Sequence, residues 1–241
     1  MFFNPAGGVL YHFRAALYAR SRWQPFRRAV GEWLHRWDPP EKKLILIGAS
    51  GGYALDSAFL GRFDKIIAVD PDPVSKWIFQ KRFPSVTTLL RWITTDFFIT
   101  AEHSAERLHA FLSHHPDAAI LISNFLGQLP FLIHDLNTRE KLILFWQNTL
   151  YTLLHGRSWA SFHDRYSSSK APNAPRHFCT AHQCTGEELV RRFYGRDCSG
   201  EWRDHSTELF FSAQSLYDYF LWQLTPKSFH IIEGVYATSA R

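Results

Sequence analysis

The chain of 241 residues lacks the features that mark membrane-spanning and secreted proteins. No apolar run approaches the roughly 18 residues that a helix needs to cross a bilayer. The N-terminus breaks early at Asn4, Pro5 and Gly7 and has no basic segment, which is untypical of a signal peptide. Three cysteines, an odd number, provide no disulfide framework. We therefore expect a soluble, cytoplasmic protein without membrane association.

The sequence also lacks internal repeats, low-complexity tracts and a strong charge bias. Its hydrophobic share of 46% and aromatic share of 16% predict a packed globular core. The net charge of +5 raises the question of a nucleic-acid partner, since six arginines precede residue 40: Arg14, Arg20, Arg22, Arg27, Arg28 and Arg36. Apolar residues at helical spacing between 23 and 37 favour the alternative, in which these arginines form the solvated face of an amphipathic helix.

Buried strands alternate with helices along the first two thirds of the chain. This order predicts a parallel sheet covered on both faces. We expect two helices within 8–37 and strands at 43–47, 65–70, 87–96, 118–124 and 157–164, with helices at 53–63, 71–83 and 137–154 between them.

The last third of the chain is less regular. Residues 165–184 lack periodicity and predict an irregular loop or lid. Thr185 and Glu188 form a capping-box pair that opens a helix over 186–195. Residues 206–212 and 227–237 are expected to form a final antiparallel pair of strands.

Small, polar and acidic residues follow the predicted parallel strands where each one ends. They are Gly48 to Gly52, Asp70, Asp96, Ser123 with Asn124, and His163 with Asp164. In open α/β sheets ligands bind beyond the carboxyl ends of the strands, so these residues mark the expected site.

The glycine-rich turn after the first strand narrows the choice of ligand. A phosphate-binding P-loop needs Lys and then Ser or Thr after its last glycine, and the sequence Gly51-Gly52-Tyr53 offers neither. The third glycine of a dinucleotide-binding turn is replaced by the bulky Tyr53, which a nucleoside without pyrophosphate tolerates better. Asp70, 18 residues beyond Gly52, is placed to accept hydrogen bonds from ribose hydroxyls, and Asp96 from an adenine amino group. The alternative for Asp70 is a cap of the following helix.

The segments "LILIGASGGY", "IIAVDPDP", "ITTDFF" and "ILISNFLGQLP" together resemble the class I S-adenosylmethionine-dependent methyltransferases. The resemblance covers residues 43–164, and "YFLWQLTPKSFHIIEGVYA" is similar to the family's terminal strand pair, whose last strand inserts antiparallel between two others. It implies an α/β fold with a Rossmann-like, doubly wound, mostly parallel seven-stranded sheet, an antiparallel last strand and an N-terminal helical extension. It also implies S-adenosylmethionine as cofactor, bound by Gly48, Ala49, Ser50, Gly51, Gly52, Asp70, Pro71, Asp96 and Asn124.

Two positions depart from the family's pattern. Leu46 stands where many members have an acid two residues before the first glycine. The sequence "SNFLGQ" replaces the Asn or Asp, two prolines and an aromatic residue that hold planar amino substrates. A small-molecule acceptor is therefore favoured over a nucleic-acid base, while RNA or DNA stays open as a partner and a homodimer as an oligomeric state.

The expected catalytic residues follow the fifth strand and precede the first. His163 is the candidate general base, beside Asp164, and Arg165 is able to hold an anionic substrate group. The alternative is that His163 only satisfies a backbone carbonyl. Tyr11 and His12 belong to residues 1–40, which we expect to form a helical cap over a catalytic domain of residues 41–241; Asp204 and His205 add polar groups ahead of the final strands.

Two further interpretations stay open at this point. His177, Cys179, His182 and Cys184 are zinc-ligand types, but their spacing is tighter than in familiar zinc sites, and we expect loop residues and no metal. The same nucleoside site also serves aminopropyl or aminobutanoyl transferases, or a non-catalytic nucleoside-binding module. The acceptor molecule is not determined by the sequence.

Overall fold

The protein folds around one mixed sheet, seen in a computed structural model that describes residues 8–98, 101–133, 135–173, 177–195, 201–211, 214 and 216–239. The strand order is β3-β2-β1-β4-β5-β9-β8-β6, and β7 pairs with β5 off this path. The parallel half comprises β1 (Lys43–Ile47), β2 (Lys65–Val69), β3 (Leu90–Ile93), β4 (Ala118–Ser123) and the first part of β5 (Trp159–Ser168). This confirms the predicted α/β fold with a mostly parallel, Rossmann-like sheet.

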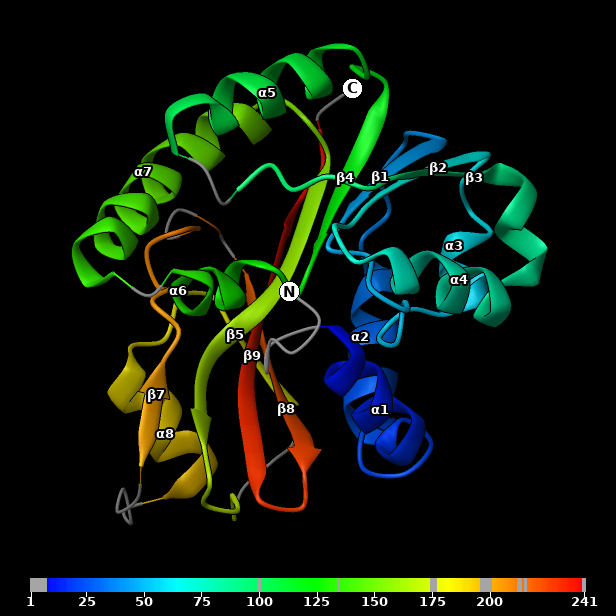
Figure 1. Ribbon diagram of the computed structural model, residues 1–241. Helices are drawn as coiled ribbons and strands as arrows, with labels where there is room; N and C mark the ends of the chain where they lie inside the picture. Colours follow the sequence, from blue (N-terminus) through cyan, green and yellow to red (C-terminus); the bar gives the residue numbers. More distant parts are fainter. Residues whose placement is uncertain are drawn as a thin grey trace.

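The two faces of the parallel strands bury different sets of side chains. Ile45 and Ile47 of β1 pack into one core with α5 (Ala101–Ser113) and α7 (Leu136–Leu154). Leu44 and Leu46 pack into a second core with α2 (Gln24–Arg36), α3 (Ser57–Leu60) and α4 (Pro73–Arg82). Successive side chains of a strand point to opposite faces, so a continuous apolar run is buried on both sides. Figure 1 shows α5 and α7 on one side of the sheet and α2, α3 and α4 on the other.

The antiparallel half extends the sheet beyond β5. The last strand, β9 (Ser228–Ala237), lies antiparallel between β5 and β8 (Tyr217–Thr225), as predicted. Two short strands, β6 (His177–Thr180) and β7 (Trp202–Asp204), raise the number of strands in the described sheet to nine, against the seven expected. Both are edge additions to the predicted core order. Helix α8 (Gly186–Tyr194) carries the predicted capping box between Thr185 and Glu188.

Residues 165–184 are more ordered than the loop or lid that the sequence predicted. Strand β5 continues to Ser168 because β9 supplies hydrogen-bond partners as far as Phe229, with a bulge between Asp164 and Tyr166. Residues 177–180 form β6 against β8. Hydrophobic residues show no regular spacing in this segment, because buried and exposed side chains do not alternate in the last part of β5 or in β6.

The strand expected at 206–212 was wrong for the residues of that range that the structure describes. The backbone of Ser206 has a positive φ of 55°, and 206–211 form turns and bends. Phe210 and Phe211 are buried by tertiary contacts, and Phe211 stacks on Trp159 at a ring-centroid distance of 4.6 Å. The partner of the last strand is β8 instead.

The helix expected over 53–63 is shorter than predicted. Asp56 caps the helix by accepting a hydrogen bond from the N–H of Phe59 at 2.7 Å, so α3 begins at Ser57 and ends at Leu60. The other connections of this half include the short helices η1 (Pro84–Leu89), η2 (Leu126–Gln128) and α6 (Leu129–Leu132).

The N-terminal helices share the sheet's second core. Trp23 lies in the connection between α1 (Gly8–Tyr18) and α2, and Trp33 lies on α2. Both are buried in the core that also contains Trp222 of β8. The aromatic stripe of residues 23–37 therefore faces inward, as the amphipathic pattern predicted. Among the described residues no helix combines the length and apolar character that crossing a membrane requires.

Candidate functional site

The glycine-rich turn after β1 adopts the backbone conformation that its composition predicts. Gly48, Ser50 and Gly52 have positive φ angles of 71°, 44° and 63°. The N–H of Gly48 donates to the carbonyl of Val69 at 2.9 Å, so the turn starts within hydrogen-bonding distance of the end of β2. Left-handed backbone is accessible to glycine without steric cost, which explains Gly48 and Gly52, whereas Ser50 adopts it with a side chain.

Close packing explains the glycines further. A Cβ on Gly48 would lie 2.9 Å from Cβ of Phe125 and 3.0 Å from the carbonyl oxygen of Ser123. A Cβ on Gly51 would meet the ring of Tyr53 at 2.7 Å. The turn is therefore fitted closely against the protein's own side chains and against the end of β4.

Asp70 stands at the carboxyl end of β2 and is bound to the turn. Its Oδ2 accepts a hydrogen bond from the N–H of Ser50 at 2.7 Å, and its Oδ1 from the N–H of Asp72 at 2.9 Å. The residue that caps α4 is Asp72, which accepts from the N–H of Val74, so the capping alternative for Asp70 is excluded. Burial raises the pKa of Asp70 to about 6, although its two backbone hydrogen bonds act to lower it.

A narrow crevice lies beside Asp70 at the carboxyl ends of β1, β2 and β3. Its lining includes Gly48 and Pro71 on one side and Asp96 with the rings of Phe97, Phe98 and Phe125 on the other. Asp96 accepts a hydrogen bond from the N–H of Phe98 at 2.7 Å. The crevice has a volume of about 10 Å³, the space of a single water molecule.

Asn124 ends β4 and connects the crevice region to β5. Its φ is 49°, its N–H donates to the carbonyl of Phe162 at 2.8 Å, and its side chain is hydrogen-bonded to Asp164. Asp164 is fully buried and also accepts from Nε2 of Gln128 and from Nδ1 of His230, each at 2.7 Å. Burial acts to raise the pKa of Asp164, but the neighbouring charges of His230 and His205 and these hydrogen bonds lower it overall.

The other two predicted catalytic residues of β5 belong to a separate buried network. His163 is fully buried, with Nδ1 at 3.0 Å from Oγ of Ser161 and Nε2 at 3.4 Å from Glu233. Arg165 is bound to Glu233 and, at 3.0 Å, to Glu208. Burial acts to raise the pKa of Glu233, but its contact with His163 and the charge of Arg165 lower it overall. Of the three residues, only Asp164 lies beside Asn124.

Tyr11 and His12 of α1 lie against the turn. His12 has Nδ1 at 2.8 Å from the hydroxyl of Tyr53 and Nε2 at 3.0 Å from Oδ2 of Asp72. The ring of Tyr11 packs against that of Tyr53 at 5.6 Å. Burial, together with the charges of Tyr53, Asp164 and Asp70, raises the pKa of Tyr11. Helix α1 therefore contacts Tyr53, which follows the turn, and Asp72, which caps α4.

Sequence reasoning missed three residues of these networks: Gln128, His230 and Glu233. His230 and Glu233 are on β9, and their roles depend on the pairing of β9 with β5. The signal available was the presence of a His and a Glu within an otherwise apolar last strand, where a buried polar group needs a partner. The partners themselves are up to 70 positions away in the sequence, as His163 is from Glu233.

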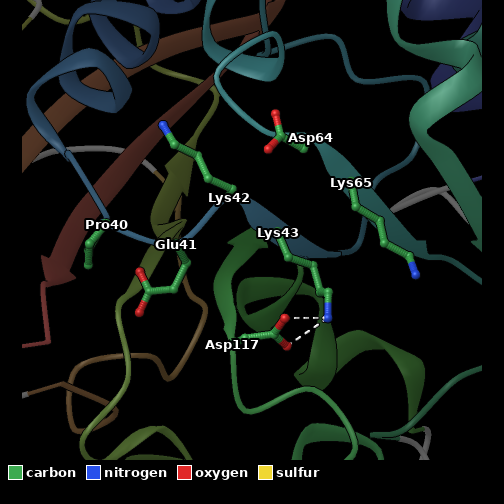
Figure 2. A pocket seen from close by; sticks show the side chains of 7 residues that line it. All are labelled: Pro40, Glu41, Lys42, Lys43, Asp64, Lys65 and Asp117. Carbon is green, nitrogen blue, oxygen red and sulfur yellow. Dashed lines mark hydrogen bonds and ion pairs between the residues drawn. The ribbon is translucent and has the colours of Figure 1, made fainter.

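A larger hollow lies at the opposite edge of the sheet. It has a volume of about 490 Å³ and is open to solvent between the first residues of β1 and β2, Lys43 and Lys65. Figure 2 shows Lys43 directed at Asp117, to which its Nζ is bound at 2.6 and 2.7 Å. None of the predicted site residues lines it, so size alone does not identify the site.

The four residues between 177 and 184 that have zinc-ligand side chains lie in different surroundings. His177 bonds Asp218 at 2.7 Å, while Cys179 is exposed and Cys184 buried. His182 lies 3.7 Å from Glu188, and the carboxylate of Glu188 closes the capping box of α8. The structure therefore does not bring all four together as one ligand set.

Comparisons with known proteins yield similar folds and no sequence family. No family model and no curated protein matches the chain. A methyltransferase described as S-adenosylmethionine-dependent, from Anabaena variabilis, is 15% identical, with 93% of this chain and 91% of that one covered and a TM-score of 0.49. The N-methyltransferase NodS of Bradyrhizobium japonicum is 14% identical, with 89% and 98% covered and a TM-score of 0.42. The strand order, with β9 antiparallel between β5 and β8, has the arrangement that the class I methyltransferase resemblance predicted.

Proposed function

We propose that the chain binds S-adenosylmethionine at the crevice beyond β1, β2 and β3 and transfers its methyl group to a small-molecule acceptor. The observation that carries this proposal is the carboxylate of Asp70, held at the end of β2 by the N–H of Ser50 from the glycine turn. A carboxylate has about four lone-pair sites, and two hydrogen bonds from the backbone leave capacity for a ribose diol.

The residues present fit the nucleoside part of that cofactor, but the crevice is too small to hold it unless the side chains that line it move. Asp70 supplies the acceptor for ribose hydroxyls, Asp96 for an adenine amino group, and the turn from Gly48 to Gly52 brings backbone close to the ligand. A volume of about 10 Å³ is too small for a nucleoside, so binding requires the aromatic walls to separate. Phe125, which is only partly buried, is the wall residue whose displacement we expect.

The acceptor side of the site is assigned to Asp164 and Tyr11. The cofactor supplies a methyl group on a positively charged sulfur, and the protein's own task is to align a nucleophile and exclude water. Asn124 joins the end of β4 to β5 through its N–H, which donates to the carbonyl of Phe162, and the charges of Asp164 and Asp70 both act on Tyr11. His163 and Arg165 act at a distance as positioning residues, since they fix β5 to β9 through Glu233.

Calorimetry with S-adenosylmethionine and S-adenosylhomocysteine tests the proposal. We expect saturable binding of both, weakened at least tenfold by Asp70→Asn, which removes the charged acceptor while retaining the shape. Asp64→Asn is the matched control, because Asp64 is an exposed acid at the opposite edge of the sheet. No saturable binding by the unaltered protein, or equal affinities for the two variants, would contradict the cofactor site.

The product identifies the group that is transferred. Methyl transfer leaves S-adenosylhomocysteine, whereas transfer of an aminopropyl or aminobutanoyl group leaves methylthioadenosine. Incubating the protein with a fractionated metabolite mixture and S-adenosylmethionine or, for the aminopropyl group, its decarboxylated form, followed by mass spectrometry, distinguishes these reactions. Methylthioadenosine as the product of turnover would replace the methyltransferase by the second transferase class.

The narrow crevice favours one other function, a module that keeps the fold without catalysis. In that case the aromatic rings of Phe97, Phe98 and Phe125 form a permanent core at the strand ends. The calorimetric experiment separates the two functions, because a closed module binds neither the cofactor nor its product.

A further inference from the structure

Three metal-ligand side chains from distant segments meet beside β5. Asp164 comes from β5, His205 from the segment after β7, and His230 from β9. One carboxylate oxygen and one nitrogen of each imidazole lie within 4.8 Å of one another. Asp164 and His205 are 0% and 3% exposed, and the side chain of His230 is 12% exposed. Such convergence of buried titratable groups needs a specific explanation.

Each imidazole is oriented by a second partner. Nδ1 of His205 donates to the carbonyl of Gly127 at 2.7 Å, which leaves the lone pair on Nε2, 3.0 Å from the hydroxyl of Ser167. Ser167 is the cross-strand neighbour of His230, so Nε2 of His205 faces the cluster. Nε2 of His230 lies 3.2 Å from the hydroxyl of Ser228. Histidines that ligate metals are commonly fixed in this way through their other ring nitrogen.

The carboxylate is also held in place, and a further oxygen lies close to it. Oδ2 of Asp164 accepts from the side-chain amide of Gln128, while Oδ1 is 2.7 Å from Nδ1 of His230. Asn124 is hydrogen-bonded to Asp164, yet its Oδ1 is buried without a hydrogen-bond partner among the described residues. The cluster therefore combines lone-pair donors with a buried oxygen that a cation or its bound water would satisfy.

Aromatic rings limit access of solvent to the cluster. The ring of Phe131 packs edge-on against His205 at 4.9 Å, and that of Trp222 lies 5.7 Å from His230. An apolar surround strengthens the interaction of a cation with its ligands, because it lowers the local dielectric.

We propose that Asp164, His205 and His230 bind one divalent first-row transition-metal ion. Two imidazoles and one carboxylate are the donors that zinc, cobalt and ferrous iron accept, whereas magnesium and calcium prefer oxygen alone. Three protein ligands leave a coordination position for water or a substrate oxygen. Zinc ligands lie about 2.0–2.2 Å from the ion, and therefore roughly 3.4 Å from one another in a tetrahedral site. Oδ1 of Asp164 and Nδ1 of His230, which are 2.7 Å apart, must therefore separate when the ion binds.

Metal binding at this site relocates one hydrogen. In the metal-free protein a hydrogen on Nδ1 of His230 is shared with Asp164. A metal bound at Nδ1 takes that lone pair, and the hydrogen moves to Nε2, where the hydroxyl of Ser228 accepts it. The carboxylate of Asp164 supplies one negative charge opposite the divalent ion.

A second group of ligand types, His182, Cys184 and Glu188, is the internal comparison. Its atoms also lie within 4.8 Å of one another. However, the side chain of His182 is 64% exposed, and Glu188 is used in the capping box of α8. Burial raises the pKa of the Cys184 thiol, which disfavours the thiolate that a metal needs.

The test is titration of metal-free, untagged protein with ZnCl₂ and, separately, CoCl₂, in the absence of any nucleoside. We expect one equivalent of each ion to bind and MgCl₂ not to compete. His205→Gln and His230→Gln should each weaken zinc at least tenfold, whereas the matched control His182→Gln should leave affinity unchanged. Circular dichroism verifies that the variants are folded.

The cobalt spectrum provides a measurement that needs no variant. Nitrogen and oxygen ligation gives visible d–d bands without the intense near-ultraviolet charge-transfer band of a thiolate. A thiolate band, loss of affinity in His182→Gln, or the absence of saturable binding would overturn the proposal. Because no nucleoside takes part, its failure would leave the proposed cofactor site untouched, and the converse also holds.

Discussion

The main-chain N–H of Ser50 donates a hydrogen bond of 2.7 Å to the carboxylate of Asp70, 20 positions later in the chain. This bond joins the glycine turn after β1 to the end of β2. It also holds a carboxylate in a site where burial raises its pKa to about 6. The raised pKa of Asp70 is therefore a property of the folded protein that can be measured.

The first prediction concerns the pH dependence of stability. Because the folded state raises the pKa of Asp70 from 3.8 to about 6, it holds the proton more tightly than the unfolded chain does. The contribution of this residue to the free energy of unfolding is therefore full below the lower value and falls by about 3 kcal/mol as the pH rises through the higher one. The check is urea denaturation of the unaltered protein and of Asp70→Asn from pH 4 to 7. The difference between the two should fall with pH, and a flat difference contradicts the raised pKa.

The second prediction concerns the steric role of Gly48. Gly48→Ala places a Cβ 2.9 Å from Phe125 and 3.0 Å from the carbonyl of Ser123, at a φ of 71°. Gly156→Ala is the matched control, because Gly156 has a φ of 74° and nothing within 4 Å of the added Cβ. Both variants carry the cost of left-handed backbone, about 1 kcal/mol, and Gly48→Ala should lose about 1–3 kcal/mol more from overpacking. Equal unfolding free energies for the two would show that the turn has room to relax.

The third prediction concerns the buried ion pair between Glu233 and Arg165. Glu233→Gln removes the charge opposite a guanidinium that is 1% exposed, so we expect a loss of about 3–5 kcal/mol in the free energy of unfolding. Glu208→Gln alters the other carboxylate on Arg165, which is 43% exposed, and should cost less than about 1 kcal/mol. Chemical denaturation of both variants measures the contrast. Similar losses would mean that solvent reaches the Glu233 site.

The fourth prediction concerns the N-terminal residues 1–40, which the sequence predicted to be a separate cap. Trp33 is fully buried in the core that α2 shares with the sheet. Trp33→Ala should therefore destabilise the whole protein by about 3–5 kcal/mol. Trp77→Ala is the control, because Trp77 is 63% exposed on α4. A single cooperative denaturant transition, shifted only by Trp33→Ala, would place the helices in the same folding unit as the sheet, whereas a separate low-stability transition would support an independent cap.

Local patterns predicted β1, β2, β4 and β5 closely because these strands are buried on both faces. The strand expected at 87–96 is shorter, since residues 84–89 form η1 and β3 contains no fully buried residue. The run from Lys43 to Ile47 needs an apolar environment on either side, and only a sheet between two helical layers supplies it. Asp70 follows such a run directly and Asp96 lies three residues beyond the end of β3, so their positions at one edge of the sheet could be inferred without coordinates.

The antiparallel half was harder to predict. Phe210 and Phe211 lie in a segment of turns and bends and are buried by tertiary contacts. The same short apolar sequence is also typical of a strand, so the sequence pattern did not distinguish the two structures. The extension of β5 beyond Asp164 depends on a bulge and on partners from β9. Periodicity within one segment contains no information on which distant segment will pair with it.

The sequence by itself determined the α/β alternation, the glycine turn and the acids at the strand ends, because these depend on burial and backbone conformation within short segments. Only the tertiary structure decided that His163 and Arg165 join Glu233 while Asp164 joins His205 and His230. Neighbouring residues of a strand point to opposite faces, and the partners on each face come from chain segments whose placement depends on the complete sheet.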